Sequence, residues 1–502
     1  AAVACALIPF GNGDVECLER NEDIEYMINA GIVLIMMRGI EKYVSTTYSF
    51  YLKQISVLLF EIYAYAVNLD TLRATLSNMP DNVKILLNIA DNIKQTQSTV
   101  DYTVLYSILS RTFSVHLQHQ HNITAFISLN GFERIFKLLP KVNTYLVGLF
   151  LGVFLPVINK DICGSFADSF LKYWDSTLSK VDFLKEADEV LFESVVSLLV
   201  CLDREPLIRS ICDYLVTTER TKWVYALKFV MAFCHREPSA LLVIKYNILK
   251  HLREHAEKTR SPEVFQDIVY LLHILASHKK VREKVAETLE SIKPVLLKSK
   301  LYHGAEPWVS SFCKLLEDVP ISDKEMRMRS ENICLISHDG LHIKNIYKSS
   351  FPSATGNIFL TSGKWYYEVE IIIPEVMQIG WTRRTYDTFY TATNMGVGDD
   401  KDSWGCDLWR HVLFNGDCKQ FGTSEPRWKS GDILQCSIDL DNRIMSFGIN
   451  GKDLGVAASG FDVLTGFTPG MSLTEECKMN FGSTKFKYGP PTGYSGYNSL
   501  PK

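Results

Sequence analysis

The chain has 502 residues, a formal net charge of −4 and 12 cysteines. Because single hydrophobic cores stop growing at about 250–300 residues, this length predicts two domains, or a solenoid plus a domain. The slightly acidic charge and the lack of long Lys/Arg blocks argue against a nucleic-acid partner, since phosphate binding needs a concentrated basic surface.

The cysteines are scattered and form no Cys-x-x-Cys pair. Several lie in apolar runs, so we interpret them as buried thiols and expect no metal and no cofactor. The start, Ala1–Cys5, lacks an initiator methionine and a basic n-region, so we expect a fragment or a processed form. Unpaired cysteines without a signal peptide indicate a reducing compartment, and we predict a cytoplasmic protein.

Residues 23–318 have a helical pattern throughout. Apolar residues recur every three or four positions, as in Trp223, Leu227, Val230 and Cys234. We predict an α-helical domain over residues 1–320. Pro320 stops the last helix, and no Gly/Ser tract follows it, so a stiff junction is favoured over a free tether.

This region has weak internal similarity. Residues 27–35 resemble residues 127–135, and in each a helix ends, a glycine (Gly31 or Gly131) follows, and an amphipathic helix begins. The pattern resembles armadillo or HEAT repeats, which at about 40–47 residues each would number roughly six or seven here. Such solenoids generally act as scaffolds. An irregular helical domain remains the alternative.

The longest apolar run covers residues 145–158 and is interrupted by Pro156. It is shorter than the roughly 20 residues that a membrane-spanning helix needs. We therefore predict a buried helix and no membrane partner.

The last third of the chain changes to strand patterns. In residues 364–371, Trp365, Tyr367, Val369 and Ile371 alternate with Lys364, Tyr366, Glu368 and Glu370. Since side chains alternate along a strand, the first set is expected to pack inward and the second to meet water. A second strand is predicted over residues 377–381.

Seven ordered segments in this part resemble a SPRY (B30.2-like) domain, an antiparallel β-sandwich that binds proteins. They cover residues 363–369, 378–381, 396–400, 428–433, 438–441, 445–451 and 480–483. The resemblance implies a SPRY domain over residues 325–488. The Gly/Pro-rich residues 489–502 are expected to form a flexible tail.

The segment Met377–Trp381 and the Asp pair that follows are most similar to the RING–SPRY ubiquitin ligases. This resemblance implies the substrate- or adaptor-recognition part of an E3 ubiquitin ligase, with a protein or short peptide as ligand and ubiquitin-system components as partners. No RING is encoded here, because its zinc-binding cysteine series is missing. The alternative is a structural or regulatory scaffold module, because SPRY domains also occur in ryanodine receptors. Enzyme activity of the chain itself stays an uncertain third possibility.

The resemblance also implies that two loops form the ligand site near one end of the sandwich. Arginine and large aromatic side chains usually dominate the energy of an interface. The predicted set is Arg383, Arg384, Tyr386, Trp404, Asp407, Trp409 and Arg410. Either tryptophan can instead pack inside. Leu408 stands where relatives often have glycine, which puts the shape of the second loop in doubt.

Three other constellations have plainer explanations. His116 and His119 lie on one helix face, but a solvated turn is favoured over a metal pair. Neighbouring Cys234 and His235 point in different directions on a helix, which argues against a nucleophile and its base. The Gly-rich residues 396–400 lack the lysine and helix of a phosphate loop, and their aspartates lack the Glu of an EF-hand, so a loop between strands is predicted.

Overall fold

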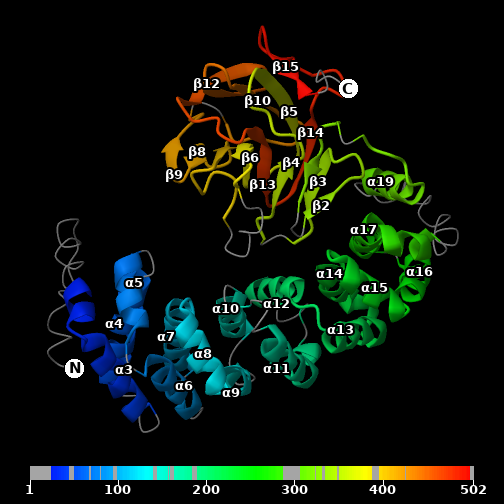
Figure 1. Cartoon of the computed structure of the whole chain (residues 1–502). Coiled ribbons are helices and arrows are strands. Elements are labelled where there is room, and N and C mark those ends of the chain that lie inside the picture. Colours follow the sequence, from blue (N-terminus) through cyan, green and yellow to red (C-terminus); the bar gives the residue numbers. More distant parts are fainter. Residues whose placement is uncertain are drawn as a thin grey trace. The chain divides into compact units, whose positions relative to one another are not determined.

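A computed structural model describes most of the chain, and its elements are shown in Figure 1. The described residues are 24–44, 50–66, 69–79, 81–93, 99–139, 144–155, 158, 163–181, 183, 189–259, 261–286, 306–322, 324–330, 334–347, 350–386, 395–423 and 426–497. The chain divides into two compact units, Ala1–Ser210 and Ile211–Lys502. Helices come first and antiparallel strands follow, which confirms the predicted fold class.

Helices of the first unit pack in two rows, and short helices lie between them. One row contains α3 (Ile32–Tyr43), α6 (Asn82–Asn92), α9 (Gly131–Leu138) and α11 (Cys163–Ser176). The other contains α4 (Phe50–Ala66), α7 (Thr99–His116), α10 (Thr144–Phe154) and α12 (Glu189–Cys201). The short helices are α5 (Asp70–Ser77), α8 (Gln120–Ser128) and η3 (Leu178–Lys180).

A left-handed residue directly precedes each helix of the first row up to α9. Gly31, Asp81 and Asn130 have φ of 71°, 56° and 53°. At Gly31 the predicted glycine turn is present. At the second predicted site Asn130 takes the left-handed conformation, whereas Gly131 is required because a Cβ there would lie 2.6 Å from the ring of Phe126. These turns recur at residues 31, 81 and 130, that is at intervals of 50 and 49 residues, which are longer than the roughly 40–47 residues of an armadillo or HEAT repeat.

His116 lies in the core of the first unit, not in a solvated turn as the sequence suggested. Asn82 Nδ2 is 2.9 Å from its Nδ1, and Tyr63 Oη is 2.6 Å from its Nε2. Because an amide nitrogen can only donate, Nδ1 accepts, so the neutral ring carries its proton on Nε2 and donates to Tyr63. The Tyr63 hydroxyl in turn donates to Met37 Sδ. Burial lowers the pKa of His116 to about 3.

Residues 145–154 of the apolar run lie in α10 (Thr144–Phe154), whose Phe150, Leu151 and Phe154 are buried. This agrees with the predicted buried helix. None of the helices in the described part of the chain combines the length and apolar content needed to cross a bilayer.

The second unit begins with helices and continues into the sheets. Helix α13 (Glu205–Thr217) spans the division between the units. Then follow η4 (Arg220–Lys222), α14 (Trp223–Cys234), α15 (Glu237–Lys245), α16 (Ile248–Lys258), α17 (Pro262–Ser277) and α19 (Glu306–Leu316). Helices α14, α17 and α19 pack side by side in a row. The change from helix to strand falls between Leu316 and Met328.

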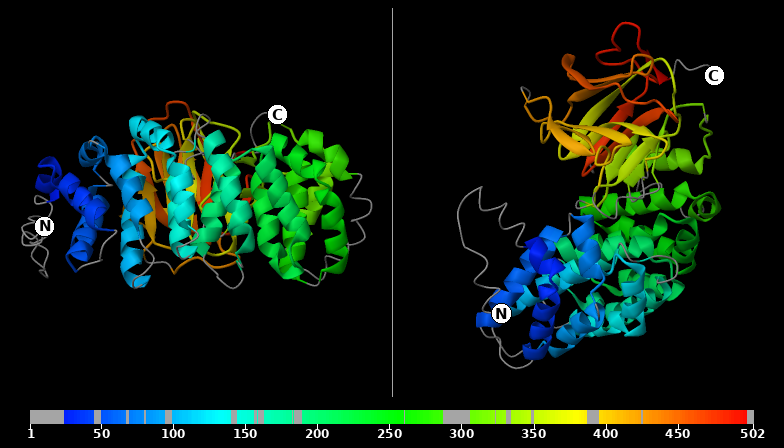
Figure 2. Two further views of the ribbon diagram at one scale, coloured as in Figure 1. Left: turned by 90° about the horizontal axis from the view of Figure 1, so that it is seen from below. Right: turned by 60° about the vertical axis from the view of Figure 1, so that its left-hand side comes forward.

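Two antiparallel sheets form the sandwich, and Figure 2 shows them from two further sides. The first sheet has the order β1 (Met328–Arg329), β4 (Ser353–Gly356), β13 (Phe467–Leu473), β6 (Met377–Arg383), β7 (Ser403–Asp407), β8 (Val412–Asn415), β9 (Asp417–Gln420). The second has the order β12 (Lys452–Ser459), β11 (Ile444–Ile449), β10 (Ile433–Asp439), β5 (Lys364–Ile373), β14 (Glu476–Asn480), β3 (His342–Asn345), β2 (Cys334–Ile336). A short strand, β15 (Ser495–Gly496), pairs in parallel with β5.

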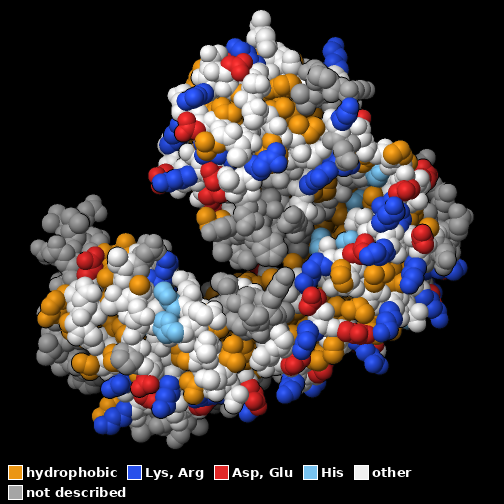
Figure 3. Space-filling model, viewed as in Figure 1, with side chains coloured by type: hydrophobic (Ala, Val, Ile, Leu, Met, Phe, Trp, Pro, Cys, Tyr) orange, Lys and Arg blue, Asp and Glu red, His pale blue; other side chains and the backbone are white. Residues whose placement is uncertain are grey.

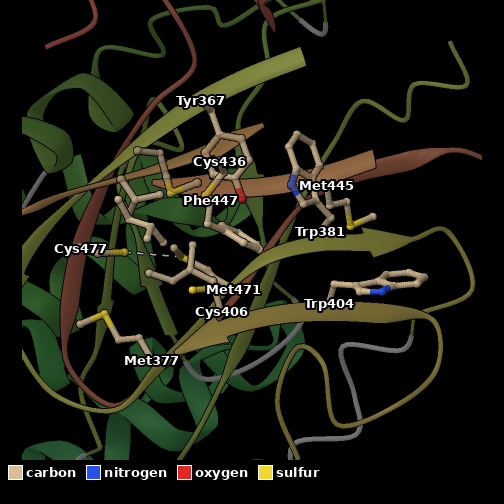
Figure 4. Packing of buried hydrophobic residues seen from close by; sticks show 14 of the residues in the cluster. Tyr367, Met377, Trp381, Trp404, Cys406, Cys436, Met445, Phe447, Met471 and Cys477 are labelled. Atoms are coloured by element: carbon tan, nitrogen blue, oxygen red, sulfur yellow. Dashed lines mark hydrogen bonds between the residues drawn. The ribbon is translucent and has the colours of Figure 1, made fainter. Parts of the chain in front are cut away.

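The inner faces of the two sheets form a continuous core rich in aromatic and sulfur-containing side chains (Figure 4). Tyr367 and Trp381 meet edge to face with ring centroids 5.0 Å apart. The Tyr367 hydroxyl donates to the Gly380 carbonyl at 2.5 Å, so its one polar atom is paired. Tyr367, Val369 and Ile371 pack inward, as the alternation of β5 predicted.

The outward side chains of β5 do not all meet water, which corrects the prediction. Tyr366 and Glu368 are only 1% and 3% exposed. The Glu368 carboxylate accepts hydrogen bonds from the Tyr366 hydroxyl and from the backbone N–H groups of Lys487, Tyr488 and Gly489. The C-terminal segment therefore covers this face.

The expected flexible tail is likewise ordered as far as it is described. Tyr497 is 1% exposed and its ring packs against Trp365, Trp381 and Phe481. Residues 498–502 lie outside the described residues. The sandwich thus extends beyond the predicted end at residue 488.

Substituting Glu368→Ala is expected to lower the free energy of unfolding by about 2–4 kcal/mol, because three backbone N–H groups lose a charged acceptor. Chemical denaturation measures the loss, and tryptic cleavage after Lys485 or Lys487 should become faster. Glu370→Ala on the same strand is the control. Equal stability of the two variants would show that Glu368 does not anchor the segment.

The buried imidazole of His116 predicts a loss of stability in acid. Its pKa in the folded chain is lowered from 6.5 to about 3, so between these values only the unfolded chain takes up the proton. The stabilising contribution is therefore complete above pH 6.5 and is lost as the pH falls towards 3.

Urea denaturation of the wild type and of His116→Gln at several pH values in this window tests this. The variant should be less stable at neutral pH but should lose less stability on acidification, whereas the control His119→Gln should follow the wild type. Parallel pH profiles for wild type and His116→Gln would contradict the assignment.

Candidate protein-interaction surfaces

The outer face of the first sheet is covered by the loop of residues 395–402. Gly405 on β7 leaves room for this loop, because a Cβ there would lie 2.0 Å from the Val397 carbonyl oxygen. Val397 N–H donates to Ser472 Oγ at 2.8 Å, and Gly398 N–H donates to Ser403 Oγ at 2.6 Å. The glycine-rich motif is thus a loop between strands, packed onto small polar side chains.

The aspartates of this loop bind within the protein. Asp399 accepts from Gln378 Nε2 at 3.0 Å and from Gly396 N–H at 2.6 Å. Asp400 accepts from the Ser403 hydroxyl at 2.6 Å. Among the described residues no cluster of three His, Cys, Asp or Glu side chains is arranged to hold a metal ion.

Arg383 is the last residue of strand β6 and Arg384 follows it, and their side chains lie in different environments. Arg383 donates to Asp402 Oδ1 at 3.0 Å and to the Asp462 carbonyl at 2.9 Å, and its guanidinium lies 5.0 Å from the Trp404 ring centroid. It is therefore mostly committed to internal contacts. Arg384 is exposed, and its guanidinium stacks 4.5 Å from the ring centroid of Phe359.

Tyr386 and Trp404 turn towards the interior. The Tyr386 hydroxyl lies 2.9 Å from Ser353 Oγ, and burial raises its pKa to about 12. Trp404 is 5% exposed and packs against Phe461 and Phe467. Of the two alternatives that the sequence left open for Trp404, the structure has the inward one.

Asp407 organises the turn after β7. Its side chain is fully buried and accepts from the backbone N–H groups of Trp409 and Arg410 at 2.8 and 3.0 Å. It also accepts from Arg410 Nε at 2.6 Å. Burial raises the pKa of the Asp407 carboxyl, although Arg410 opposes the shift. The acid thus shapes the loop that carries Trp409 and Arg410.

The sequence missed Arg427, which lies over Trp409. Its guanidinium is 4.8 Å from the Trp409 ring centroid, and that of Arg410 is 4.8 Å from the ring centroid of Phe414. Arg427 lies eighteen positions beyond Trp409 on another loop, so no spacing in the sequence pairs them. In the sequence, only its position directly before Trp428, which is buried, could have drawn attention to Arg427.

The predicted residues do not share one end of the sandwich. Strands β6 and β7 are antiparallel, with Thr382 opposite Ser403 and Ile379 opposite Cys406. Arg384 therefore lies at the end where β7 begins, and Arg410 lies at the end where β7 finishes. The single-site arrangement was wrong because it ignored the direction of β7.

An open groove lies between the edge strands β9 and β12, with a volume of about 680 Å³. Lys419 on β9 donates to the Ala457 carbonyl on β12 at 2.7 Å and joins the two edges. Its lining contains the basic residues Arg383, Lys401 and Lys419 and the acidic residues Asp417 and Asp462, so charges of both signs lie around it. On the face drawn in Figure 3, basic and acidic side chains are likewise interspersed over the described residues.

Within the second unit, polar side chains of β3 contact helices α17 and α19, and a carboxylate of β14 binds these side chains. The Glu476 carboxylate binds Lys344 Nζ and His342 Nε2, each at 2.6 Å. The His342 ring packs against Trp308, and Lys344 lies over Tyr270. Burial disfavours the Glu476 carboxylate, but its two partners outweigh burial and lower its pKa.

Hydrogen bonds extend this junction. Tyr347 donates to the Lys228 carbonyl of α14 at 3.1 Å. Ser311 Oγ on α19 accepts from His338 N–H at 2.6 Å and lies 2.7 Å from His273 Nε2. The sandwich is therefore bound to these helices by specific contacts.

The pair Cys234 and His235 cannot supply a nucleophile and its base. Cys234 is fully buried, and burial raises the pKa of its thiol far above the ordinary value, which disfavours the reactive thiolate. Burial lowers the pKa of His235 to about 4.

Comparison with known proteins identifies the sandwich. Residues 364–484 match the model of the SPRY domain family. The chain is 36% identical over 156 residues to the E3 ubiquitin-protein ligase RKP of Arabidopsis thaliana, covering 30% of this chain and 12% of that protein. It is 28% identical over 169 residues to the ATP-dependent RNA helicase DDX1 of Xenopus laevis, covering 33% of this chain and 22% of that protein.

Among solved structures, the SPRY domain of human HERC1 matches 33% of this chain and 100% of its own length, with 18% identity and a TM-score of 0.26. The match to the family model shows that residues 364–484 form a SPRY domain, a protein-interaction module. The chain spans a small fraction of the curated relatives named above.

Glu476→Gln should lower the free energy of unfolding by about 3–5 kcal/mol, because it removes the buried carboxylate that binds the Lys344 ammonium and the His342 ring. Thermal and chemical unfolding of the complete chain measure this. Glu475→Gln, on the neighbouring half-buried residue, should change stability by no more than about 0.5 kcal/mol. Equal effects of the two substitutions would show that the Glu476 contacts do not hold the junction.

Proposed function

We propose that this chain recognises a protein through the ends of its SPRY sandwich and is the substrate- or adaptor-recognition part of an E3 ubiquitin ligase. The observation that carries this is the pairing of exposed arginines with aromatic rings. Arg384 stacks on Phe359 at one end, and Arg427 stacks on Trp409 at the other. Arginine and large aromatic residues are the types that most often dominate binding energy.

The connection to ubiquitin rests on the relative named as an E3 ligase, which this chain matches over 12% of that protein's length. The catalytic module would lie outside residues 1–502, with ubiquitin-system components as partners. The cytoplasm is the proposed location, in keeping with the free thiols of the described cysteines.

A structural or regulatory module of a larger assembly is the second candidate. The buried contacts of Glu476 and Tyr347 favour it, because they fix the sandwich on helices α14, α17 and α19. Armadillo- or HEAT-like stacking of the first unit, itself a proposal, would suit a scaffold.

The double variant Arg384→Ala/Arg427→Ala tests the proposal. We expect it to lose partners that the wild type captures from a cell extract, by about 1–2 kcal/mol for each contact that acts as a hot spot. Lys401→Ala/Lys429→Ala removes the same charge from exposed positions and is the matched control. Melting curves verify that all proteins are folded.

The two candidates differ in what happens to the captured proteins. In the ligase, the proteins lost by the double variant should also carry less ubiquitin in cells that express it. In the scaffold, partner capture falls but ubiquitin attachment does not change. If the folded double variant retains every partner, recognition does not use the ends of the sandwich.

A further inference from the structure

The turn after β7 contains Trp409 and Arg410, and each of these two residues forms an arginine–aromatic pair with a residue outside the turn. Trp409 is half-buried against the core, and the exposed Arg427 covers its outer side. Arg410 is 42% exposed and lies over Phe414 of β8. The four side chains come from two loops and a strand and form a surface that we call the Arg427 surface.

The charges of this surface are unevenly neutralised. Asp407 is the carboxylate that holds Arg410, and it is fully buried beneath the turn. It accepts from Nε of that guanidinium, and the Arg410 side chain stays 42% exposed. Among the described residues no carboxylate pairs with Arg427. Within the described residues, the surface thus combines two guanidiniums with one carboxylate, which is buried.

A stacked guanidinium is well placed to bind a carboxylate. When the aromatic ring lies against one face of the guanidinium, the N–H groups along its edge are left to bind a carboxylate in bidentate fashion. The ring also offers apolar area beside the charge. Such a surface fits a peptide in which acidic side chains lie next to apolar ones.

Among the described residues, the other end of the sandwich has a single exposed arginine over an aromatic ring. There Arg383 is already paired with Asp402 and with the Asp462 carbonyl, so Arg384 is the exposed guanidinium. A long polyanion such as a nucleic acid would need a wider basic field. On the face drawn in Figure 3, acidic side chains interrupt the basic ones.

We propose that the Arg427 surface selects an acidic, extended peptide segment of a partner protein, and that Arg427 and Arg410 bind its carboxylates. This inference rests on the proposed protein-binding function and adds the chemical class of the ligand.

The experiment selects binders for the complete chain from a library of random linear peptides. Asp and Glu should be enriched among the selected peptides relative to the starting library. Binding of these peptides to wild type, Arg427→Ala, Arg427→Lys and Lys429→Ala is then compared by fluorescence polarisation at two salt concentrations. Lys429 is an exposed cation on the same loop and serves as the matched control.

Arg427→Ala should weaken binding about tenfold, as expected for a hot-spot arginine. Arg427→Lys should recover only part of the affinity, because lysine keeps the charge but loses the planar fork. Lys429→Ala should change the affinity less than twofold at either salt concentration. Higher salt should weaken binding of every protein slightly, because it screens exposed charges.

Each other result overturns the inference. Selected peptides without acidic enrichment, or acidic peptides that bind Arg427→Ala as well as wild type, would reject the Arg427 surface while leaving protein recognition intact. Full rescue by Arg427→Lys would reject the stacked geometry. A library that yields no binder, together with unchanged partner capture by the double variant described above, would reject the proposed function as well.

Discussion

The sandwich depends on covering the outer faces of both sheets with segments that are not strands. Polar groups on such a face are costly once buried, unless the covering segment supplies hydrogen-bond partners. Glu368 meets this constraint by accepting three backbone N–H groups of the C-terminal segment. On the other sheet, Ser403 and Ser472 do the same for the loop of residues 395–402. These polar residues therefore fix the path of long connections.

This constraint also determines where a partner can bind. The covering segments and the junction with helices α17 and α19 occupy part of the sandwich surface, whereas exposed arginines lie at its ends. At the ends, the exposed arginines rest on aromatic rings that belong to the fold, so they are held in position before a partner arrives. Pre-positioned side chains lose less conformational entropy on binding than free ones.

The sequence predicted the elements better than their spatial relations. Alternation placed Tyr367 and Val369 in the core, and residues 145–154 of the predicted apolar run lie in a helix with buried side chains. The burial of Glu368 escaped prediction because its partners lie about 120 residues later, and period-two patterns carry no information about what covers a strand.

The candidate site shows the same limit. The residue types were predicted, but grouping Arg384 with Arg410 required knowing the register of β6 and β7, which places them at opposite ends. Trp404 and Trp409 have the same side chain, yet one fills the core and the other supports Arg427. Their roles follow from their positions in β7 and in the turn after it, which composition does not reveal.

The helices and the sandwich of the second unit share one further property that bears on function. Glu476 lies on β14 next to the core strand β5, and its partners His342 and Lys344 on β3 also contact Trp308 and Tyr270 of the helices. A salt bridge in this position gives little net stability but strongly disfavours arrangements in which its charges are buried without partners. The sandwich is thus held in one orientation on α17 and α19. A protein bound at its ends would be presented at a fixed geometry relative to these helices, which is what both a ligase and a scaffold require of a recognition domain.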